Sequence, residues 1–100
     1  MPTYDLLSTM TAEGRRTVKE RPERIKEVNK EVEELGVKFV SQFAVLGRYD
    51  FVSIVEATDN ETVVRVSAEL GSRGTLQITS LPAIPVEKLI RRVKTTKAKR

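Results

Sequence analysis

Residues 45–52, Val45-Leu46-Gly47-Arg48-Tyr49-Asp50-Phe51-Val52, consist of two apolar runs joined through a glycine. Apolar runs on either side of a short break are typical of a β-hairpin. Gly47 and Arg48 fit the two central positions of a type II′ turn, because glycine takes the positive φ of the first position without strain. The segment therefore predicts a tight hairpin with a two-residue turn.

The strands on either side of this turn are predicted over residues 37–46 and 49–57, and both of their faces are largely apolar. Alternation along the first strand puts Phe39 and Phe43 on one face and Val40 on the other. A monomeric sheet with helices on one side carries polar side chains on its free face. Two apolar faces therefore predict a second layer, and another copy of the same sheet is the simplest one.

Helix and strand patterns alternate along the rest of the chain. Thr11 is suited to cap a first helix, and Thr58 or Asp59 a later one. Pro22 fits the first position of the main helix, which Gly36 ends in the left-handed conformation. The predicted elements are a strand over 3–10, a short helix over 12–19, the main helix from 22, the hairpin strands, a helix from 58 to 71, a strand over 75–81 that Pro82 breaks, and a terminal helix over 85–93.

This order, β-α-β-β-α-β plus a C-terminal helix, predicts an α+β domain with ferredoxin-like topology. Right-handed crossovers place two helices on one face of a four-stranded antiparallel sheet. One hundred residues suffice for a single small core, so we expect one domain over residues 1–93. Residues 94–100 are predicted to be a basic, disordered tail.

Composition narrows the possible chemistry. The chain contains no histidine and no cysteine, which excludes a structural zinc site, a Ser-His-Asp triad and a histidine base, so we expect no metal or cofactor. The net charge of +4 comes from the last ten residues, and without a basic excess elsewhere we do not expect the folded part to bind nucleic acid. Neither a membrane span nor a signal peptide is visible, which predicts a cytoplasmic protein.

The hairpin residues Gly47, Tyr49 and Asp50, with Arg48 interposed, resemble the signature of the GYD domain family. This resemblance implies a small α+β fold without an established general activity. It also implies an assembly similar to dimeric α/β-barrel domains, in which two sheets pack face to face. Ile84 departs from the family, which has an aromatic residue there. Further positions that look like the family are Pro2-Thr3-Tyr4, residues 11–14, Pro22, Val55-Glu56-Ala57, residues 71–75, Thr79 and Leu81.

Tyr49 and Asp50, at the mouth of a strand, form the first candidate site. A carboxylate and a phenol there can bind a cation, an amine or a polar ligand, or Asp50 can accept a proton. In the structural alternative, Asp50 accepts hydrogen bonds from backbone amides and Tyr49 packs at a subunit interface. Arg48 at the turn is exposed in either case.

Polar side chains on the otherwise apolar strands form a second candidate set, and the strand register decides which of them share a face. They can line a pocket or hydrogen-bond to one another at an interface. The set consists of Tyr4, Ser8, Ser41, Ser53 and Glu56. Residues 71–75 resemble a phosphate-binding loop only superficially, because they follow a helix and precede a strand, which favours a helix cap and a turn.

Together these patterns predict a homo-oligomeric module that binds a small polar ligand or serves as an accessory protein. The ligand is expected between the sheet and the hairpin. The alternative is a cofactor-independent enzyme that transfers protons through Asp50, Glu56 or a tyrosine, and a third possibility is a nucleic-acid contact made by the tail. The candidate ligand-binding residues are Tyr4, Arg48, Tyr49, Asp50 and Glu56.

Overall fold

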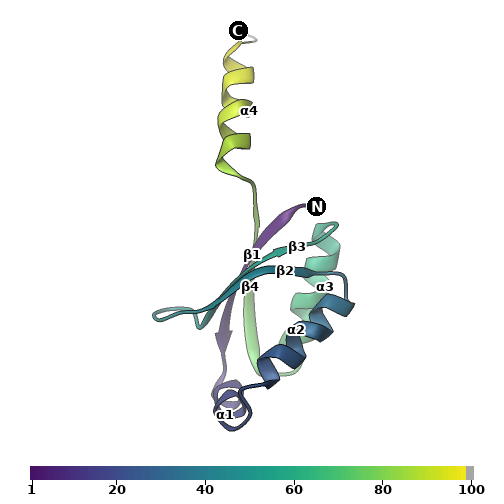
Figure 1. The fold of residues 1–100 in the computed structure, drawn as a ribbon, viewed down its shortest axis with the longest axis vertical. Coiled ribbons are helices and arrows are strands. Elements are labelled where there is room, and N and C mark those ends of the chain that lie inside the picture. The colour runs from purple at the N-terminus through teal and green to yellow at the C-terminus, as the bar shows by residue number, and fades with distance from the viewer. Residues whose placement is uncertain (99–100) are drawn as a thin grey trace.

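A computed structural model describes residues 1–98 and shows one four-stranded antiparallel sheet (Figure 1). The strand order is β2-β3-β1-β4, so the first strand lies inside the sheet and the last one at an edge. Helices α2 (Arg24–Glu34) and α3 (Asn60–Gly71) lie against one face of this sheet (Figure 1). The predicted α+β architecture with ferredoxin-like strand order is confirmed. The strands are β1 (Thr3–Met10), β2 (Lys38–Ala44), β3 (Phe51–Glu56) and β4 (Leu76–Ala83).

The core lies between the sheet and these two helices. Alternate residues of β1 point into it, which buries Tyr4 and Leu6, and Val55 of β3 is fully buried beside them. Val32 of α2 and three residues of α3 complete the packing from the other side. The full set of buried apolar residues is Tyr4, Leu6, Val32, Val37, Val55, Ala57, Val63, Val66 and Leu70.

Helix α1 (Ala12–Glu20) begins as predicted, with the Thr11 hydroxyl accepting a hydrogen bond from the Gly14 backbone N–H (3.1 Å). Its first turn is held against the start of β4, because the Thr11 N–H donates to the Thr75 carbonyl (3.0 Å). A Cβ at position 14 would collide with that same carbonyl oxygen. Glycine at position 14 therefore allows this close approach.

Helix α2 (Arg24–Glu34) begins two residues later than predicted, since Pro22 lies in the turn before it and Glu23 occupies the cap position. Gly36 ends it with φ of 102°, as predicted. Helix α3 (Asn60–Gly71) is capped by Asp59, whose carboxylate accepts from the Thr62 N–H (2.9 Å).

The hairpin differs from the prediction in its turn. The last backbone pair before the loop joins the Val45 N–H to the Asp50 carbonyl (2.9 Å), so four residues, 46–49, form the connection instead of two. Gly47 does take positive φ, at 110°, but the turn is not the predicted two-residue type II′ turn. Both strands are consequently shorter than the apolar runs that predicted them.

A β-bulge in β2 overturns the predicted sharing of one face by Phe39 and Phe43. The register shifts between Phe39 and Ser41, so Phe39 pairs with the buried Val55 while Phe43 pairs with Val52 on the opposite face. An extra residue in a strand reverses the side-chain alternation beyond it. Counting alternate residues cannot detect such an insertion.

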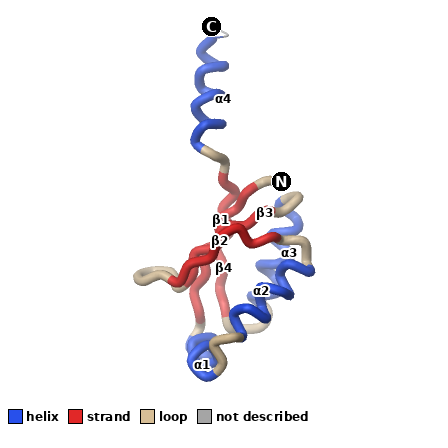
Figure 2. The backbone as a smooth tube through the Cα atoms, viewed as in Figure 1, coloured by secondary structure: helices blue, strands red, loops and turns tan. Residues whose placement is uncertain are grey.

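Pro82 lies inside β4 and does not break it. The strand is at the sheet edge, where one side of the backbone has no neighbouring strand and a missing N–H is tolerated. After Pro85, helix α4 (Val86–Ala98) extends away from the sheet (Figures 1 and 2). It continues past the predicted end at Val93 as far as Ala98; residues 99 and 100 lie outside the described part, and the disorder expected for the tail stays a prediction.

Across the described residues 1–98, none of the helices has the length and apolar content required to cross a membrane.

Candidate functional site

A cavity of about 250 Å³ lies between the helix-facing side of the sheet and helices α1 and α2. All four strands contribute to its floor, and the walls are mainly aliphatic and aromatic. Apolar cavities with a few polar groups are the usual form of small-molecule sites. Its lining consists of Leu6, Ser8, Met10, Gly14, Thr17, Val18, Arg24, Ile25, Val28, Val32, Phe39, Gln42, Phe51, Ser53, Leu70, Arg73, Thr75, Leu76 and Ile78.

Two serines provide hydroxyl groups on the floor of the cavity. Ser53 Oγ accepts a hydrogen bond from Gln42 Nε2 (3.2 Å), and Gln42 is itself fixed by Asn29 of α2. The Ser8 side chain is buried and has no hydrogen-bond partner within residues 1–98. A ligand in the cavity would therefore find one hydroxyl already engaged and one available.

Two arginines form the charged part of the lining, and carboxylates of α2 and α3 hold both of them. Arg73 Nη2 lies 2.7 Å from Glu31 Oε1 and 3.6 Å from Glu69 Oε1. Arg24 Nη1 lies 3.1 Å from carboxylate oxygens of Glu27 and Glu31. The hydrogen bond from Arg24 lowers the pKa of Glu27 below its usual value, with a further contribution from Arg21.

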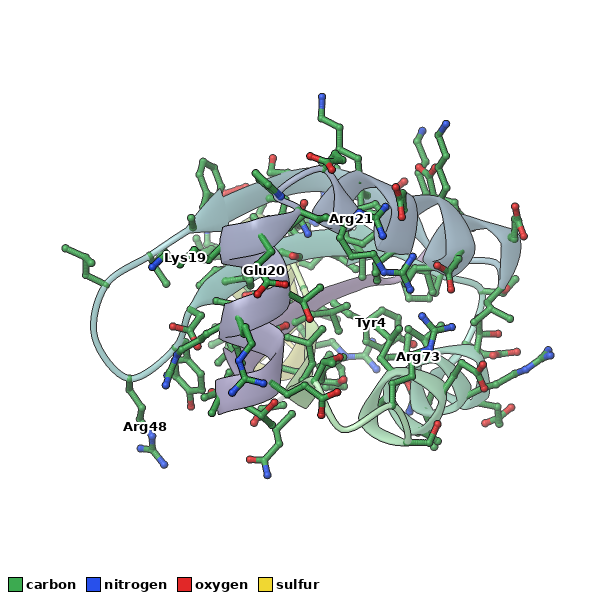
Figure 3. All side chains as sticks on the ribbon, turned by 90° about the horizontal axis from the view of Figure 1, so that it is seen from below. Tyr4, Lys19, Glu20, Arg21, Arg48 and Arg73 are labelled. Carbon is green, nitrogen blue, oxygen red and sulfur yellow. The ribbon has the colours of Figure 1, made fainter. Side chains whose placement is uncertain are left out.

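The Arg73 guanidinium retains one unused donor. Its Nη1 is buried and makes no hydrogen bond to any described residue. In Figure 3 the Arg73 side chain extends from the end of α3 toward α2. Buried polar groups are normally satisfied, so an orphan guanidinium N–H beside a cavity is a chemically distinctive feature.

A family model described as "GYD domain" matches residues 4–93. The chain belongs to the GYD domain family. It is 54% identical over 95 residues to the "Glutamine synthetase and cystathionine beta-lyase binding protein" of Thermus thermophilus, covering 94% of this chain and 100% of that protein. The crystal structure of TTHA0845, also from Thermus thermophilus, shares the fold, with a TM-score of 0.53 and 23% identity over 85% of this chain and 95% of that one.

The GYD hairpin holds its aspartate against the end of β1. Asp50 Oδ2 accepts a hydrogen bond from the Met10 backbone N–H (2.7 Å) and lies 3.6 Å from Arg15 Nη2 of α1. The Asp50 N–H also donates to the Ser8 carbonyl (2.8 Å). These contacts correspond to the structural alternative for Asp50, in which its carboxylate accepts from backbone amides.

The other signature residues lie further out on the hairpin. Arg48 packs over the Tyr49 ring, with its guanidinium carbon 5.7 Å from the ring centroid, a cation–π arrangement. In Figure 3 Arg48 lies at the hairpin tip and points away from the body of the GYD domain. Neither residue lines the cavity.

The remaining two candidate residues, Tyr4 and Glu56, lie at the opposite end of the sheet. Tyr4 is buried, and its hydroxyl donates to Asn60 Oδ1 (2.6 Å). Glu56 ends β3 on the helix-free face, opposite Lys38 of β2. The length of β3, roughly 17 Å at 3.3 Å per residue, separates this end from the hairpin. The structure therefore does not bring the five candidates to one place, and ligand binding by any of them stays a prediction.

The second candidate set divides between the two faces of the sheet. Ser8 and Ser53 face the helices with Tyr4, whereas Ser41 and Glu56 face the other way. Asp50 and Glu56, the carboxylates that the enzymatic alternative requires, are not among the cavity-lining residues, and no other carboxylate is among the described ones. Within residues 1–98, the structure contains no group of His, Cys, Asp or Glu that could hold a metal ion.

Sequence reasoning missed the arginines of the cavity. Arg73 lies in the loop over residues 71–75, which forms a helix end and a turn, as predicted. Its role depends on carboxylates from α2 and α3 that are distant in sequence. The one available signal was an arginine between two glycines just before a strand, which is too common a pattern to indicate a site.

Proposed function

We propose that this GYD domain is a homo-oligomeric accessory protein that binds metabolic enzymes. The support from relatives is the match over nearly the full chain to a protein named for binding glutamine synthetase and cystathionine β-lyase. Identity of 54% makes a shared kind of partner a reasonable hypothesis. Glutamine synthetase and cystathionine β-lyase are accordingly the first enzymes to test.

The structural observation that carries this proposal is helix α4. Its apolar residues recur at spacings of three and four and form one stripe, yet each is between 46% and 62% exposed. The helix extends away from the sheet, so the body of the domain does not cover this stripe (Figure 2). The apolar stripe of α4 consists of Val86, Leu89, Ile90 and Val93.

An isolated helix of this length is marginal in water, because nucleation is costly and packing normally supplies most helix stability. An uncovered apolar stripe also marks an interaction surface. Basic side chains flank the stripe, with Lys88, Arg91 and Lys94 against the single acidic Glu87. These features favour an occupant with an apolar groove and an acidic rim, into which the helix inserts as amphipathic helices do.

Self-association is proposed through the helix-free face of the sheet. One row across three strands is apolar, formed by Phe43, Val52 and Leu7. In the next row Ile54 and Leu81 lie on either side of Asp5, and Phe43 is 55% exposed. A second copy related by a two-fold axis would cover the same patch on both partners.

The test of enzyme binding uses the α4 stripe. Leu89→Ser together with Val93→Ser removes two adjacent apolar contacts and leaves every charge in place. We expect the affinity for glutamine synthetase or cystathionine β-lyase, measured by surface plasmon resonance, to fall at least about tenfold, since anchors of this type typically contribute about 1–2 kcal/mol each.

Val64→Ser is the matched control, because Val64 is an exposed apolar residue of α3 outside the stripe. It should bind as the original chain does. Equal loss in both variants would contradict a role for α4, and absence of binding to both enzymes by the unaltered chain would contradict the proposed partners.

A further inference from the structure

We propose that the cavity between the sheet and helices α1 and α2 binds a small carboxylate with an apolar body. Arg73 would hold the carboxylate group, and the aliphatic and aromatic lining would hold the rest of the molecule. This site is separate from the hairpin and from the α4 stripe, so its test is independent of enzyme binding.

Cavity size sets the size of the ligand. A cavity of about 150 Å³ in another protein accommodates benzene, and this one measures about 250 Å³. A molecule with one ring or a short alkyl chain, roughly ten non-hydrogen atoms in all, therefore fits. Its apolar body would contact Val18 and Ile25 on one side and Leu76 and Ile78 on the other.

The positive charge of the cavity lining favours a ligand with an anionic head group. The two charged residues of the lining are arginines, and the carboxylates that hold them, Glu27, Glu31 and Glu69, are outside it. Arg73 Nη1 has no acceptor among the described residues although it is buried. A carboxylate oxygen would supply that acceptor and form a charge-assisted hydrogen bond, which is stronger than a neutral one.

Ser8 strengthens this assignment. Its hydroxyl also lines the cavity and has no hydrogen-bond partner within residues 1–98. The available polar groups of the cavity thus include a cationic donor and hydroxyl groups, and neither Asp nor Glu is among the described residues of the lining to repel an anion. A cation or an amine would find no such complement.

The experiment is a titration of the full chain with 3-phenylpropionate, followed by amide shifts in two-dimensional NMR spectra. The neutral isostere 3-phenylpropan-1-ol is titrated in parallel. We expect saturable shifts at Leu6, Ser8 and Leu76, and an affinity for the acid about tenfold higher than for the alcohol. Shifts confined to residues outside the cavity would overturn the site, and equal affinities would overturn the role of Arg73.

Two pairs of variants sharpen the result. Val18→Phe fills the cavity and should abolish binding, whereas Val64→Phe adds the same bulk on the exposed face of α3 and should not. Arg73→Lys keeps a positive charge but removes the second guanidinium nitrogen, and it should lower affinity for the acid without affecting the alcohol. Arg65→Lys on α3 is its control. Unchanged binding in Val18→Phe or Arg73→Lys would overturn the proposal, and the comparison of acid and alcohol needs no variant to fold.

Discussion

Asp50 shows how one side chain can join three elements. Its carboxylate lies at the base of the hairpin loop, accepts from the last amide of β1 and approaches Arg15 of α1. Hydrogen bonds to a charged acceptor contribute more to stability than neutral ones. The aspartate of the GYD signature therefore has a clear structural role in this chain, whatever else it does.

For this single residue we predict that Asp50→Ala lowers the free energy of unfolding by about 1.5–3 kcal/mol, the range for a hydrogen bond to a charged group. Asp50→Asn should cost less, because the amide oxygen can still accept from Met10. Urea unfolding followed by circular dichroism measures both. Arg48→Ala at the hairpin tip is the control and should change stability by less than about 0.5 kcal/mol. An unchanged midpoint in Asp50→Ala would show that the hydrogen bond to Met10 contributes little.

The caps of α1 and α3 depend on residues close in sequence, whereas the positions that the prolines occupy depend on neighbouring elements. Thr11 and Asp59 cap α1 and α3 as their side-chain chemistry predicts. Pro22 and Pro82 lie where neighbouring elements decide their effect: one in a turn before α2, the other inside an edge strand. Capping depends on residues three apart, whereas tolerance of proline depends on which backbone groups already have partners.

At the scale of one helix, we predict that the stability of α3 changes with pH in the acid range because of its capping residue, Asp59. Hydrogen bonds from the backbone N–H and hydroxyl of Thr62 lower the pKa of Asp59 in the folded state below its ordinary value. The stabilisation is therefore complete above the ordinary value of about 4 and disappears as the pH falls through the lower folded value. Measuring the unfolding midpoint from about pH 6 to about pH 2 tests this.

Two variants separate capping from titration at this position. Asp59→Ser retains a capping hydroxyl but has no titrating group. The unfolding midpoint of this variant should therefore fall less steeply with acid pH than that of the original chain. Asp59→Ala should lower the unfolding midpoint near neutral pH, and its midpoint should likewise fall less steeply with acid pH. If the acid dependence of all three proteins were identical, the low pKa of Asp59 would not be coupled to folding.

At the scale of the whole molecule, the helices of residues 1–98 cover one face of the sheet and leave the other face open. Helices α2 and α3 cover the face with Tyr4, Leu6 and Val55, while the other face shows the row through Val52. The row itself has no polar residue on β1–β3, although Asp5 lies between Ile54 and Leu81 in the next row and Glu56 lies opposite Lys38 at the margin. A partly apolar sheet face of this kind is the expected contact surface for a second copy.

For the proposed assembly we predict that Phe43→Glu yields a monomer, because the substitution would bury a carboxylate in the proposed contact. Sedimentation velocity or native mass spectrometry at matched concentrations reports the change. Val64→Glu, on the exposed side of α3, should leave the oligomer intact. A monomeric unaltered chain would contradict self-association itself, and an oligomeric Phe43→Glu would place the contact on another surface.

The sequence by itself determined the order and type of most elements, the caps of α1 and α3, the positive φ of Gly36 and Gly47, and the family. These features depend on residues a few positions apart, so local patterns suffice to predict them. The tertiary structure alone decided the bulge that separates Phe39 from Phe43, the strand around Pro82, the course of α4 and the cavity with Arg73. Each of these features depends on which distant segments become neighbours. Folding of the chain brings Arg73 next to Glu31 and to the strands that line the cavity, and the spacing of these residues along the sequence does not encode that arrangement.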